Sequence, residues 1–196
     1  QEPYVKFVKQ VTSRPVVGVG RFTSPDVMVS QVQRGIMDMI GAARPSIADP
    51  FLPRKIEEGR LDDIRECIGC NICVTGDWTH TPIQCTQNPT MGEEWRRGWH
   101  PENMNRKGHS NRVLVVGAGP AGLEAAMSLG RRGYEVALAD TNEGGGRVIK
   151  EAGLPGLSVW RRVVDYRLGQ IEKLSQVTFY PGSHMDRDSI FSYGAE

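Results

Sequence analysis

The sequence has no long hydrophobic run, and this argues against a membrane helix. Such a helix needs roughly 20 consecutive apolar residues, and no stretch of the 196-residue chain approaches that length. No signal peptide is expected, because the first residues are polar and no apolar stretch with a cleavage site follows them. The chain also lacks an initiator Met, starts at Gln1 in a predicted helix and ends at Glu196, where another strand is expected. We therefore expect an internal fragment of a longer protein, without membrane contact.

An excess of either charge is also absent. The chain has 24 basic and 23 acidic residues, which give a net charge of +1. No overall field favours nucleic acid or an anionic membrane as a partner. Hydrophobic residues make up 39% and charged residues 24%, as in an ordinary globular protein. The length allows one large domain or two small ones.

Cysteine is scarce and unevenly distributed. The chain has four cysteines, and all of them lie within residues 67–85. A disulfide scaffold would spread its cysteines to connect distant segments, so this clustering indicates a metal site instead. A reducing, cytoplasmic compartment is the expected location.

Residues 1–62 alternate between predicted helices and predicted strands. Helical spacing predicts a helix over 4–11, and nearly continuous apolar runs at 15–20 and 38–43 predict two strands buried on both faces. With a helix between the strands and another after them, the strands should be parallel with a right-handed crossover. Two strands cannot bury their own faces, so this segment is interpreted as part of a larger sheet.

The second and third helices of this segment have recognisable start signals. Ser24 is the predicted N-cap of one helix, with Pro25 at its first position, and Asp49 is the predicted N-cap of the other. The apolar side of the helix after Ser24 is predicted to consist of Val27, Val29, Val32 and Ile36.

The rest of the chain divides into a loop segment and a second α/β segment. Residues 63–110 are rich in Cys, Trp, Thr, Pro, Asn and Gly, and are predicted to be loop structure that needs an internal staple, with a polar linker at 100–111. From residue 112, a strand, a helix and a strand follow one another over 113–140, and another helix and strand come after them. We expect a nucleotide-binding domain over 111–196.

The cysteines have the spacing C-x2-C-x2-C-x11-C at Cys67, Cys70, Cys73 and Cys85. Three closely spaced thiolates can surround one side of a 4Fe-4S cluster, while the fourth comes from a separate turn. Gly69 permits a tight backbone reversal between them. Structural zinc is the alternative, although zinc sites usually pair cysteines in two separated C-x2-C units or with histidines. Four uncoordinated thiols are a further alternative.

A glycine motif follows the first strand of the C-terminal segment. Gly117, Gly119 and Gly122 fit G-x-G-x-x-G between a strand and a helix. In such motifs the glycines permit a tight turn, close approach of a pyrophosphate and close helix–strand packing. Asp140 ends the next strand, where a carboxylate usually binds an adenosine ribose. This pattern predicts binding of FAD, NAD or ADP, the alternative being a simple glycine-rich turn.

Two other places combine glycine with arginine and are predicted to bind a phosphate. The run 144–146, followed by Arg147, is a second backbone cradle at the nucleotide site. Gly20 with Arg21 ends one predicted strand, and Arg44 ends the next. The loops after the last two strands of a β/α barrel often hold a phosphate, and arginine binds phosphate through two parallel hydrogen bonds. The alternatives are a flexible turn and ordinary surface arginines.

Several longer stretches carry a family resemblance. The stretches DMIGAARPSIADPFLPRKIEEGR, CIGCNIC, CTQNP, EEWRRGWHPE and VLVVGAGPAGLEAA resemble the bacterial trimethylamine, dimethylamine and histamine dehydrogenases. These are iron–sulfur flavoproteins related to old yellow enzyme and 2,4-dienoyl-CoA reductase. The resemblance implies an α/β chain in three parts: the end of an FMN-binding (β/α)8 barrel over 1–62, a 4Fe-4S segment over 63–110, and part of a Rossmann-like ADP- or FAD-binding domain over 111–196.

The resemblance also implies a function. In this family a small amine is oxidised at FMN, water hydrolyses the imine, and single electrons pass through the cluster to an electron-transferring flavoprotein. By this resemblance Gly20, Arg21 and Arg44 hold the FMN phosphate, the four cysteines hold the cluster, and the glycine motif with Asp140 holds the nucleotide. The full-length protein is expected to be a homodimer in the bacterial cytoplasm.

Catalytic residues cannot be assigned, because the family's substrate pocket and covalent flavin attachment lie upstream of residue 1. The x11 gap differs by a residue from that of some relatives, so the subgroup stays open. The x2 spacing before the third cysteine favours amine dehydrogenases over the reductases. An NADPH-dependent 2,4-dienoyl-CoA or enoate reductase is the first alternative, and a zinc-stapled nucleotide-binding module is the second.

Overall fold

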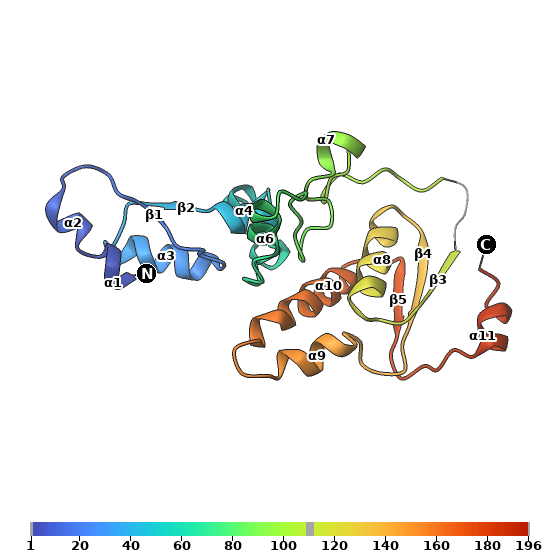
Figure 1. Cartoon of the computed structure of the whole chain (residues 1–196). Coiled ribbons are helices and arrows are strands. Elements are labelled where there is room, and N and C mark those ends of the chain that lie inside the picture. Colours follow the sequence, from blue (N-terminus) through green and yellow to red (C-terminus); the bar gives the residue numbers. More distant parts are fainter. Residues whose placement is uncertain (1, 109–111, 196) are drawn as a thin grey trace. The chain divides into compact units, whose positions relative to one another are not determined.

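A computed structural model describes residues 2–108 and 112–195. The described residues form two compact units, residues 1–92 and residues 93–196, each of mixed α/β structure with parallel strands (Figure 1). Residues 109–111 of the predicted linker lie outside the described part. No helix within the described ranges is long and apolar enough to cross a membrane.

The first unit contains the two predicted parallel strands. β1 (Val17–Val19) pairs with β2 (Met39–Gly41), with Val17 opposite Met39. The helices of this unit are α1 (Glu2–Val5), α2 (Val8–Val11), α3 (Pro25–Gln33), α4 (Ala43–Ala48), α5 (Leu52–Glu57) and α6 (Ile72–Trp78), and a short 3-10 helix η1 covers Leu61–Asp63.

Several expectations for this unit need correction. The predicted helix over 4–11 is divided into α1 and α2. Strand β1 is not buried on both faces, since Val17 and Val19 are 56% and 64% exposed and only Gly18 is buried between them. On α3 the predicted valines are exposed, and Met28 is the helix's apolar contribution to a small core with Leu52 and Ile64. One side of α3 packs against this core, and Met28 lies on that side.

Asp49 is not the N-cap that its position before Pro50 suggested. Helix α5 starts later, at Leu52, and Phe51 is its N-cap residue. The Asp49 carboxylate is buried instead and binds groups from three other residues. The segment predicted as loop contains α6, and α7 (Glu94–Arg97) follows in the second unit.

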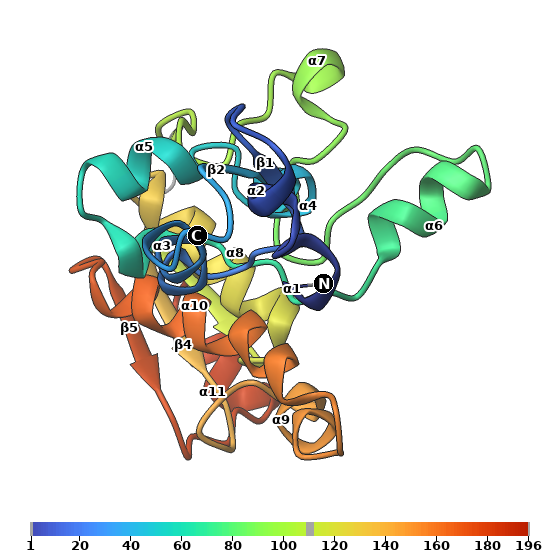
Figure 2. The same ribbon diagram turned by 90° about the vertical axis from the view of Figure 1, so that its left-hand side faces the viewer.

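The second unit is a three-stranded parallel sheet in the order β3-β4-β5. The strands are β3 (Arg112–Val116), β4 (Glu135–Ala139) and β5 (Val177–Tyr180), as the sequence predicts. The helices are α8 (Pro120–Arg131), α9 (Arg147–Ala152), α10 (Arg162–Glu172) and α11 (Arg187–Ser192), with a 3-10 helix η2 (Ser158–Arg161) before α10. Helices α8 and α10 lie next to each other and cover one face of the sheet (Figures 1 and 2).

The core of this unit lies between those two helices and the sheet. Leu123 and Met127 of α8 are fully buried, and Val164 of α10 and Leu138 of β4 pack in the same cluster. The sheet therefore presents the loops after β3 and β4 at one edge, because parallel strands end on the same side.

Candidate cofactor sites

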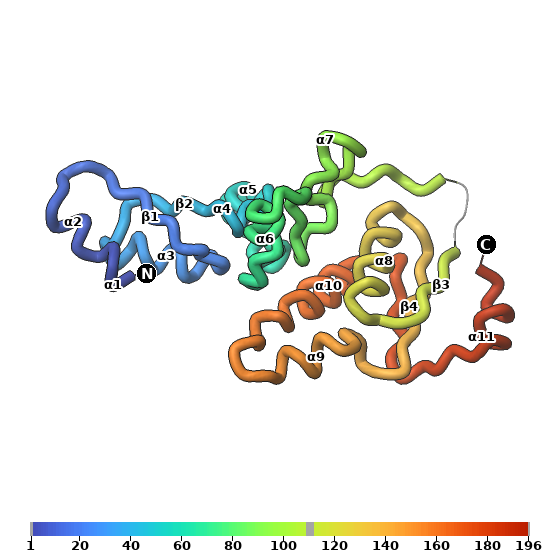
Figure 3. The backbone as a smooth tube through the Cα atoms, in the orientation of Figure 1, coloured from blue at the N-terminus to red at the C-terminus, as the bar shows by residue number. Residues whose placement is uncertain are grey.

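The cysteine segment is anchored at both ends by buried polar groups. Before it, the buried Arg65 donates its backbone N–H to Asp49 Oδ2 at 2.9 Å. After it, Gln87 and Asn88 are buried, and Asn88 Nδ2 donates to the Ile47 carbonyl at 3.1 Å. Because α4 and the residue after it supply these partners, both ends of the segment are fixed to the same part of the first unit. Figure 3 traces the backbone of this region through α4, α5 and α6.

A buried ion pair supports this anchor. Lys55 Nζ lies 2.7 Å from Asp49 Oδ2, and both side chains are about 1% exposed. Lys55 also donates to the Asp63 carbonyl at 2.8 Å, and Asp49 Oδ1 accepts the Phe51 N–H at 3.0 Å. Burying charges is costly unless they are paired and hydrogen-bonded, and here both ions are.

Three of the four cysteines are close enough to influence one another. The charges of Cys67 and Cys70 act on Cys85, and Cys70 Sγ contacts Thr86 Oγ1 at 3.2 Å. Backbone amides point at two of the sulfurs: Gly69 N–H donates to Cys67 Sγ at 3.4 Å, and the amides of Gln87 and Asn88 donate to the Cys85 thiol. Burial raises the pKa of the Cys85 thiol, against the effect of these amides.

Cys73 lies on helix α6 and is partly buried. Within residues 2–108 and 112–195, no three side chains of His, Cys, Asp or Glu form a metal centre. The assignment of Cys67, Cys70, Cys73 and Cys85 as cluster ligands therefore stays a prediction.

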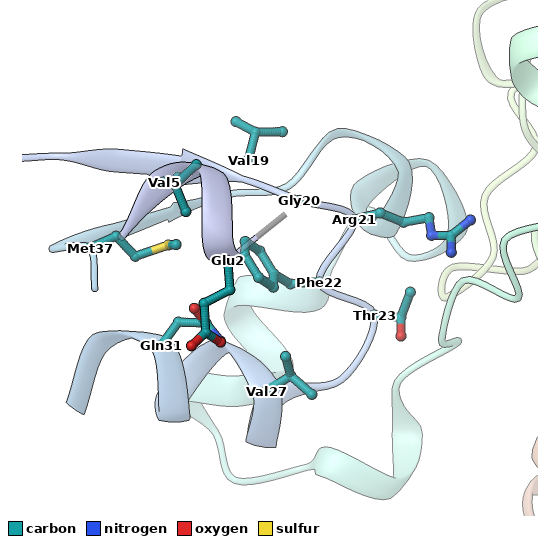
Figure 4. Close-up of a pocket in the computed structure, with 11 residues that line it drawn as sticks. Glu2, Val5, Val19, Gly20, Arg21, Phe22, Thr23, Val27, Gln31 and Met37 are labelled. Atoms are coloured by element: carbon teal, nitrogen blue, oxygen red, sulfur yellow. The ribbon is translucent and has the colours of Figure 1, made fainter. Parts of the chain in front are cut away.

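The two predicted phosphate arginines both contact the cysteine loop. Arg44, on α4, donates from Nη1 to Asn71 Oδ1 at 2.7 Å. Arg21, after β1, donates from Nη1 to the Gly69 carbonyl at 3.4 Å, a long bond. Arg21 has the unusual backbone φ of +52°, and its side chain extends away from Glu2 (Figure 4). The arginines that follow the carboxyl ends of β1 and β2 thus both contact the loop between the first three cysteines.

A cavity of about 230 Å³ adjoins the end of β1. Gly20 and Arg21 line it, together with Phe22 and Thr23 of the following loop (Figure 4). Arg44 is not among the lining residues. The structure thus places Gly20 and Arg21 at one cavity. Arg44 is related to Arg21 by a different feature, since both arginines donate hydrogen bonds to the cysteine loop.

The glycine motif of the second unit has the predicted backbone geometry. Gly117 has a φ of +98°, which L-residues rarely adopt. A Cβ on Gly122 would lie 1.8 Å from the Gly117 carbonyl oxygen, so only glycine fits where α8 meets the loop. A Cβ on Gly117 or Gly119 would meet nothing within 4 Å. The loop is therefore closed towards the helix and open on the side where a phosphate would approach.

Asp140 is hydrogen-bonded to this loop. Its Oδ2 accepts the Ala118 N–H at 2.6 Å, and its Oδ1 accepts the Asn142 N–H at 2.8 Å. Partial burial favours the protonated carboxyl, but these hydrogen bonds outweigh it and lower the pKa of Asp140. The carboxylate is thus charged and lies beside the glycine motif, as its position after β4 predicts.

The second glycine run packs against the first. Gly145 N–H donates to the Ala118 carbonyl at 2.6 Å, and a Cβ on Gly146 would lie 3.4 Å from Gly119 Cα. Arg147 starts α9, its side chain is 88% exposed, and it pairs with Glu151 at 2.6 Å. The structure therefore joins the two glycine loops, and places Arg147 after them with its side chain in an ion pair.

Sequence reasoning missed the buried polar residues at the ends of the cysteine segment. Arg65, Gln87 and Asn88 are more buried than their residue types usually are. A faint signal was available, because all three lie within three residues of a predicted cluster cysteine. Their partners could not be found from the sequence, since Arg65 and Gln87 are 22 residues apart.

Comparison with protein families finds one match within each of the two units. Residues 1–63 match the NADH:flavin oxidoreductase / NADH oxidase family, and residues 111–181 match the pyridine nucleotide-disulphide oxidoreductases. The two matches fit the end of a flavin-binding β/α barrel followed by a Rossmann-like domain.

Individual relatives identify the family more closely. The chain is 51% identical over its whole length to a dimethylamine dehydrogenase from Hyphomicrobium sp. (strain x), of which it covers 27%. All of it superposes on histamine dehydrogenase from Rhizobium sp. 4-9 with a TM-score of 0.97 and 61% identity, and covers 29% of that protein. A 6-hydroxypseudooxynicotine amine oxidase from Pseudomonas geniculata N1 also gives a TM-score of 0.97, with 56% identity and 30% coverage.

Over its whole length the chain is thus similar to dimethylamine and histamine dehydrogenases, as the motifs of its sequence predict. It spans less than a third of the length of these relatives.

Proposed function

We propose that this chain is the electron-relay part of an iron–sulfur flavoprotein that oxidises a small amine. The observation that carries the proposal is the contact of Arg21 and Arg44 with the loop of Cys67, Cys70 and Cys73. If these arginines hold the phosphate of FMN, flavin and cluster are bound by adjoining residues. A short path between the two suits transfer of single electrons.

The residues present fit a 4Fe-4S cluster. Cluster sulfurs and their thiolate ligands are tuned by backbone N–H donors, and Cys67 and Cys85 already receive such donors. In this proposal all four cysteines, including Cys73 of α6, are the ligands. FMN would supply the acceptor for the amine's electrons and the cluster a one-electron relay.

In this proposal Gly20, Arg21 and Arg44 bind the FMN phosphate. Gly20 lets the backbone come close, and the guanidinium groups supply charge and paired donors. The proposal assigns no catalytic residue for the amine among residues 1–196.

The second unit is proposed to bind an adenine nucleotide, either ADP or FAD. Its Gly117–Gly119 loop is open at the N-terminus of α8, where free amides and the helix dipole favour a pyrophosphate. The charged Asp140 beside it would bind the ribose. Arg147 would reach the nucleotide only by leaving its ion pair with Glu151.

The remaining expectations are also proposals. They are a small amine as substrate, an electron-transferring flavoprotein as acceptor, a homodimer of the full-length protein, a cytoplasmic location, and a three-part division at residues 62 and 110. The names of the relatives that are 51–61% identical support the amine and the dehydrogenase reaction.

The first test is to purify the full-length protein anaerobically and to measure reduction of a dye acceptor with dimethylamine, trimethylamine or histamine. Amine-dependent reduction supports the proposal. Its absence, together with NADPH oxidation that depends on an unsaturated thioester, would establish the reductase alternative. Zinc in place of iron and sulfide would favour the nucleotide-binding module.

The nucleotide released from the same protein on denaturation should then be identified by mass. ADP is expected for the dehydrogenase reading, because the second unit would then take no part in electron transfer. FAD would mean that this unit is a point of electron entry and would favour the reductase.

A further inference from the structure

Arg65 is a buried cation next to the cysteine segment. The residue is 1% exposed and comes two residues before Cys67. Its guanidinium Nη1 donates to the Gln87 carbonyl at 2.9 Å, and Gln87 comes two residues after Cys85. One side chain therefore connects the two ends of the segment that carries all four cysteines.

The bond between Arg65 and Gln87 is one of several that close the segment. Gln87 Nε2 donates back to the Glu66 carbonyl at 3.1 Å. The Gln87 carbonyl shares its peptide unit with the N–H of Asn88, which donates to Cys85, so the unit that Arg65 binds also contacts a thiol. A displacement of the Gln87 backbone would move the sulfur of Cys85 relative to that of Cys67.

Arg65 brings a second buried positive charge to this region, since Lys55 is the cation of the neighbouring buried ion pair. Lys55 lies at 2.7 Å from Asp49, and that carboxylate meets Arg65 through the backbone N–H. A cluster held by four thiolates is an anion whose negative charge increases on reduction. A buried cation beside such a group favours the more negative state, because charges interact strongly in a medium of low dielectric constant.

We propose that Arg65 is a positioning residue for the iron–sulfur cluster, which closes the cysteine segment at Gln87 and favours the reduced cluster through its buried charge. The inference rests on the proposed function, since it requires a cluster at Cys67, Cys70, Cys73 and Cys85. It assigns to Arg65 a role that the ligand spacing does not reveal.

The test uses the full-length protein with Arg65→Gln and Arg65→Lys variants. Two properties are measured: iron and sulfide per protein with the rate of iron loss to a chelator, and the cluster's midpoint potential by EPR-monitored titration. Arg65→Gln removes the charge, so we expect a lower midpoint potential and iron loss that is faster by about 10–100-fold, the usual effect of losing such a supporting group. Arg65→Lys keeps the charge without the planar fork, so iron loss should accelerate while the potential stays near that of the wild type.

Arg60→Gln is the matched control, because Arg60 is a nearby arginine that is 40% exposed and paired with Glu58. It should change neither property. Wild-type iron retention and potential in both Arg65 variants would overturn the inference and leave the proposed function intact. A wild-type protein that contains no iron would overturn both. If Arg65→Gln does not fold, wild-type iron retention by Arg65→Lys still refutes the positioning role.

Discussion

At the scale of single residues, Gly122 is the position where the nucleotide loop is least tolerant of change. A methyl group there would lie 1.8 Å from the Gly117 carbonyl oxygen, and neither backbone segment can move without opening the glycine motif. We predict that Gly122→Ala weakens ADP binding at least about tenfold and destabilises the unit by about 1–3 kcal/mol, the usual cost of overpacking. Calorimetric titration with ADP and urea denaturation measure the two effects.

Gly169→Ala is the control for that substitution. Gly169 is also a helical glycine, in α10, but a Cβ there would meet nothing within 4 Å. Alanine should stabilise the protein by about 0.5–1 kcal/mol, since it restricts the unfolded chain and favours the helix, and ADP binding should not change. Equal ADP affinity in Gly122→Ala and Gly169→Ala would contradict a nucleotide site at this loop.

Asp140 gives a prediction about pH. The hydrogen bonds from Ala118 and Asn142 hold the pKa of Asp140 below its ordinary value of 3.8. A carboxyl with a lowered pKa in the folded state contributes stability that is fully present above the ordinary value and is lost as the pH falls through the folded value. We expect wild type to be more stable than Asp140→Asn at pH 5, with the difference shrinking below about pH 4.

The stability difference is measured as the shift in urea midpoint at each pH. Glu93 and Asp186 of the same unit also have lowered pKa values, and they are present in both proteins, so their contribution cancels. A difference that stays constant from pH 5 to pH 3 would mean that the Asp140 carboxylate is not held by these amides.

At the scale of elements, helices α8 and α10 are joined by a mostly buried ion pair. Arg167 Nε lies 2.8 Å from Glu124 Oε2, and Arg167 Nη1 donates to the Val163 carbonyl at 2.8 Å. Removing one partner leaves a charge in a poorly solvated place. We predict that Arg167→Met destabilises the protein by about 2–4 kcal/mol, somewhat less than a fully buried pair would give, because Glu124 is partly exposed.

Arg161→Met provides the comparison for Arg167→Met. Arg161 pairs with Asp165 four residues later, but both side chains are more than half exposed. Exposed pairs contribute roughly 0–1 kcal/mol, so this variant should unfold at nearly the wild-type urea concentration. If the two arginine variants lose the same stability, the pair between α8 and α10 contributes no more to the free energy of unfolding than an exposed pair does.

The elements differ in how well the sequence predicts them. Strands β3 to β5 and helices α8 and α10 follow from runs and spacings whose apolar residues enter a local core, so pattern and burial agree there. Helix α6 was not predicted, because its residues Thr75 and Gly76 are weak helix formers. Thr75 Oγ1 instead donates to the Asn71 carbonyl, which supports the first turn.

The candidate sites show the same division. The glycine loop and Asp140 are adjacent because a strand, a tight turn and a helix place them so, and local sequence records that geometry. The bonds of Arg44 to Asn71 and of Arg65 to Gln87 join residues more than 20 positions apart. These bonds depend on how whole segments fold back on one another. The residue types alone do not predict which positions of two distant segments come into contact.

At the scale of the whole molecule, apolar burial is divided unequally between the two units. The larger core, built around Leu123, Met127 and Leu138, belongs to residues 93–196. In residues 1–92 the core around Met28, Leu52 and Ile64 is small, and Val17 and Val19 of β1 are exposed. Exposed apolar strands promote association between chains. The two units should therefore behave differently when each is produced alone.

We predict that residues 93–196 alone give a monomer that unfolds cooperatively on heating and binds ADP, because the sheet, both covering helices and the glycine loop are all contained in it. Residues 1–92 alone should associate, and adding back iron and sulfide should not make them monomeric, since a cluster at the cysteines leaves β1 exposed. Circular dichroism melting and sedimentation measure these properties. If residues 1–92 were monomeric and unfolded cooperatively while residues 93–196 were unfolded, the prediction that the unit with the larger core is the more stable one would be wrong.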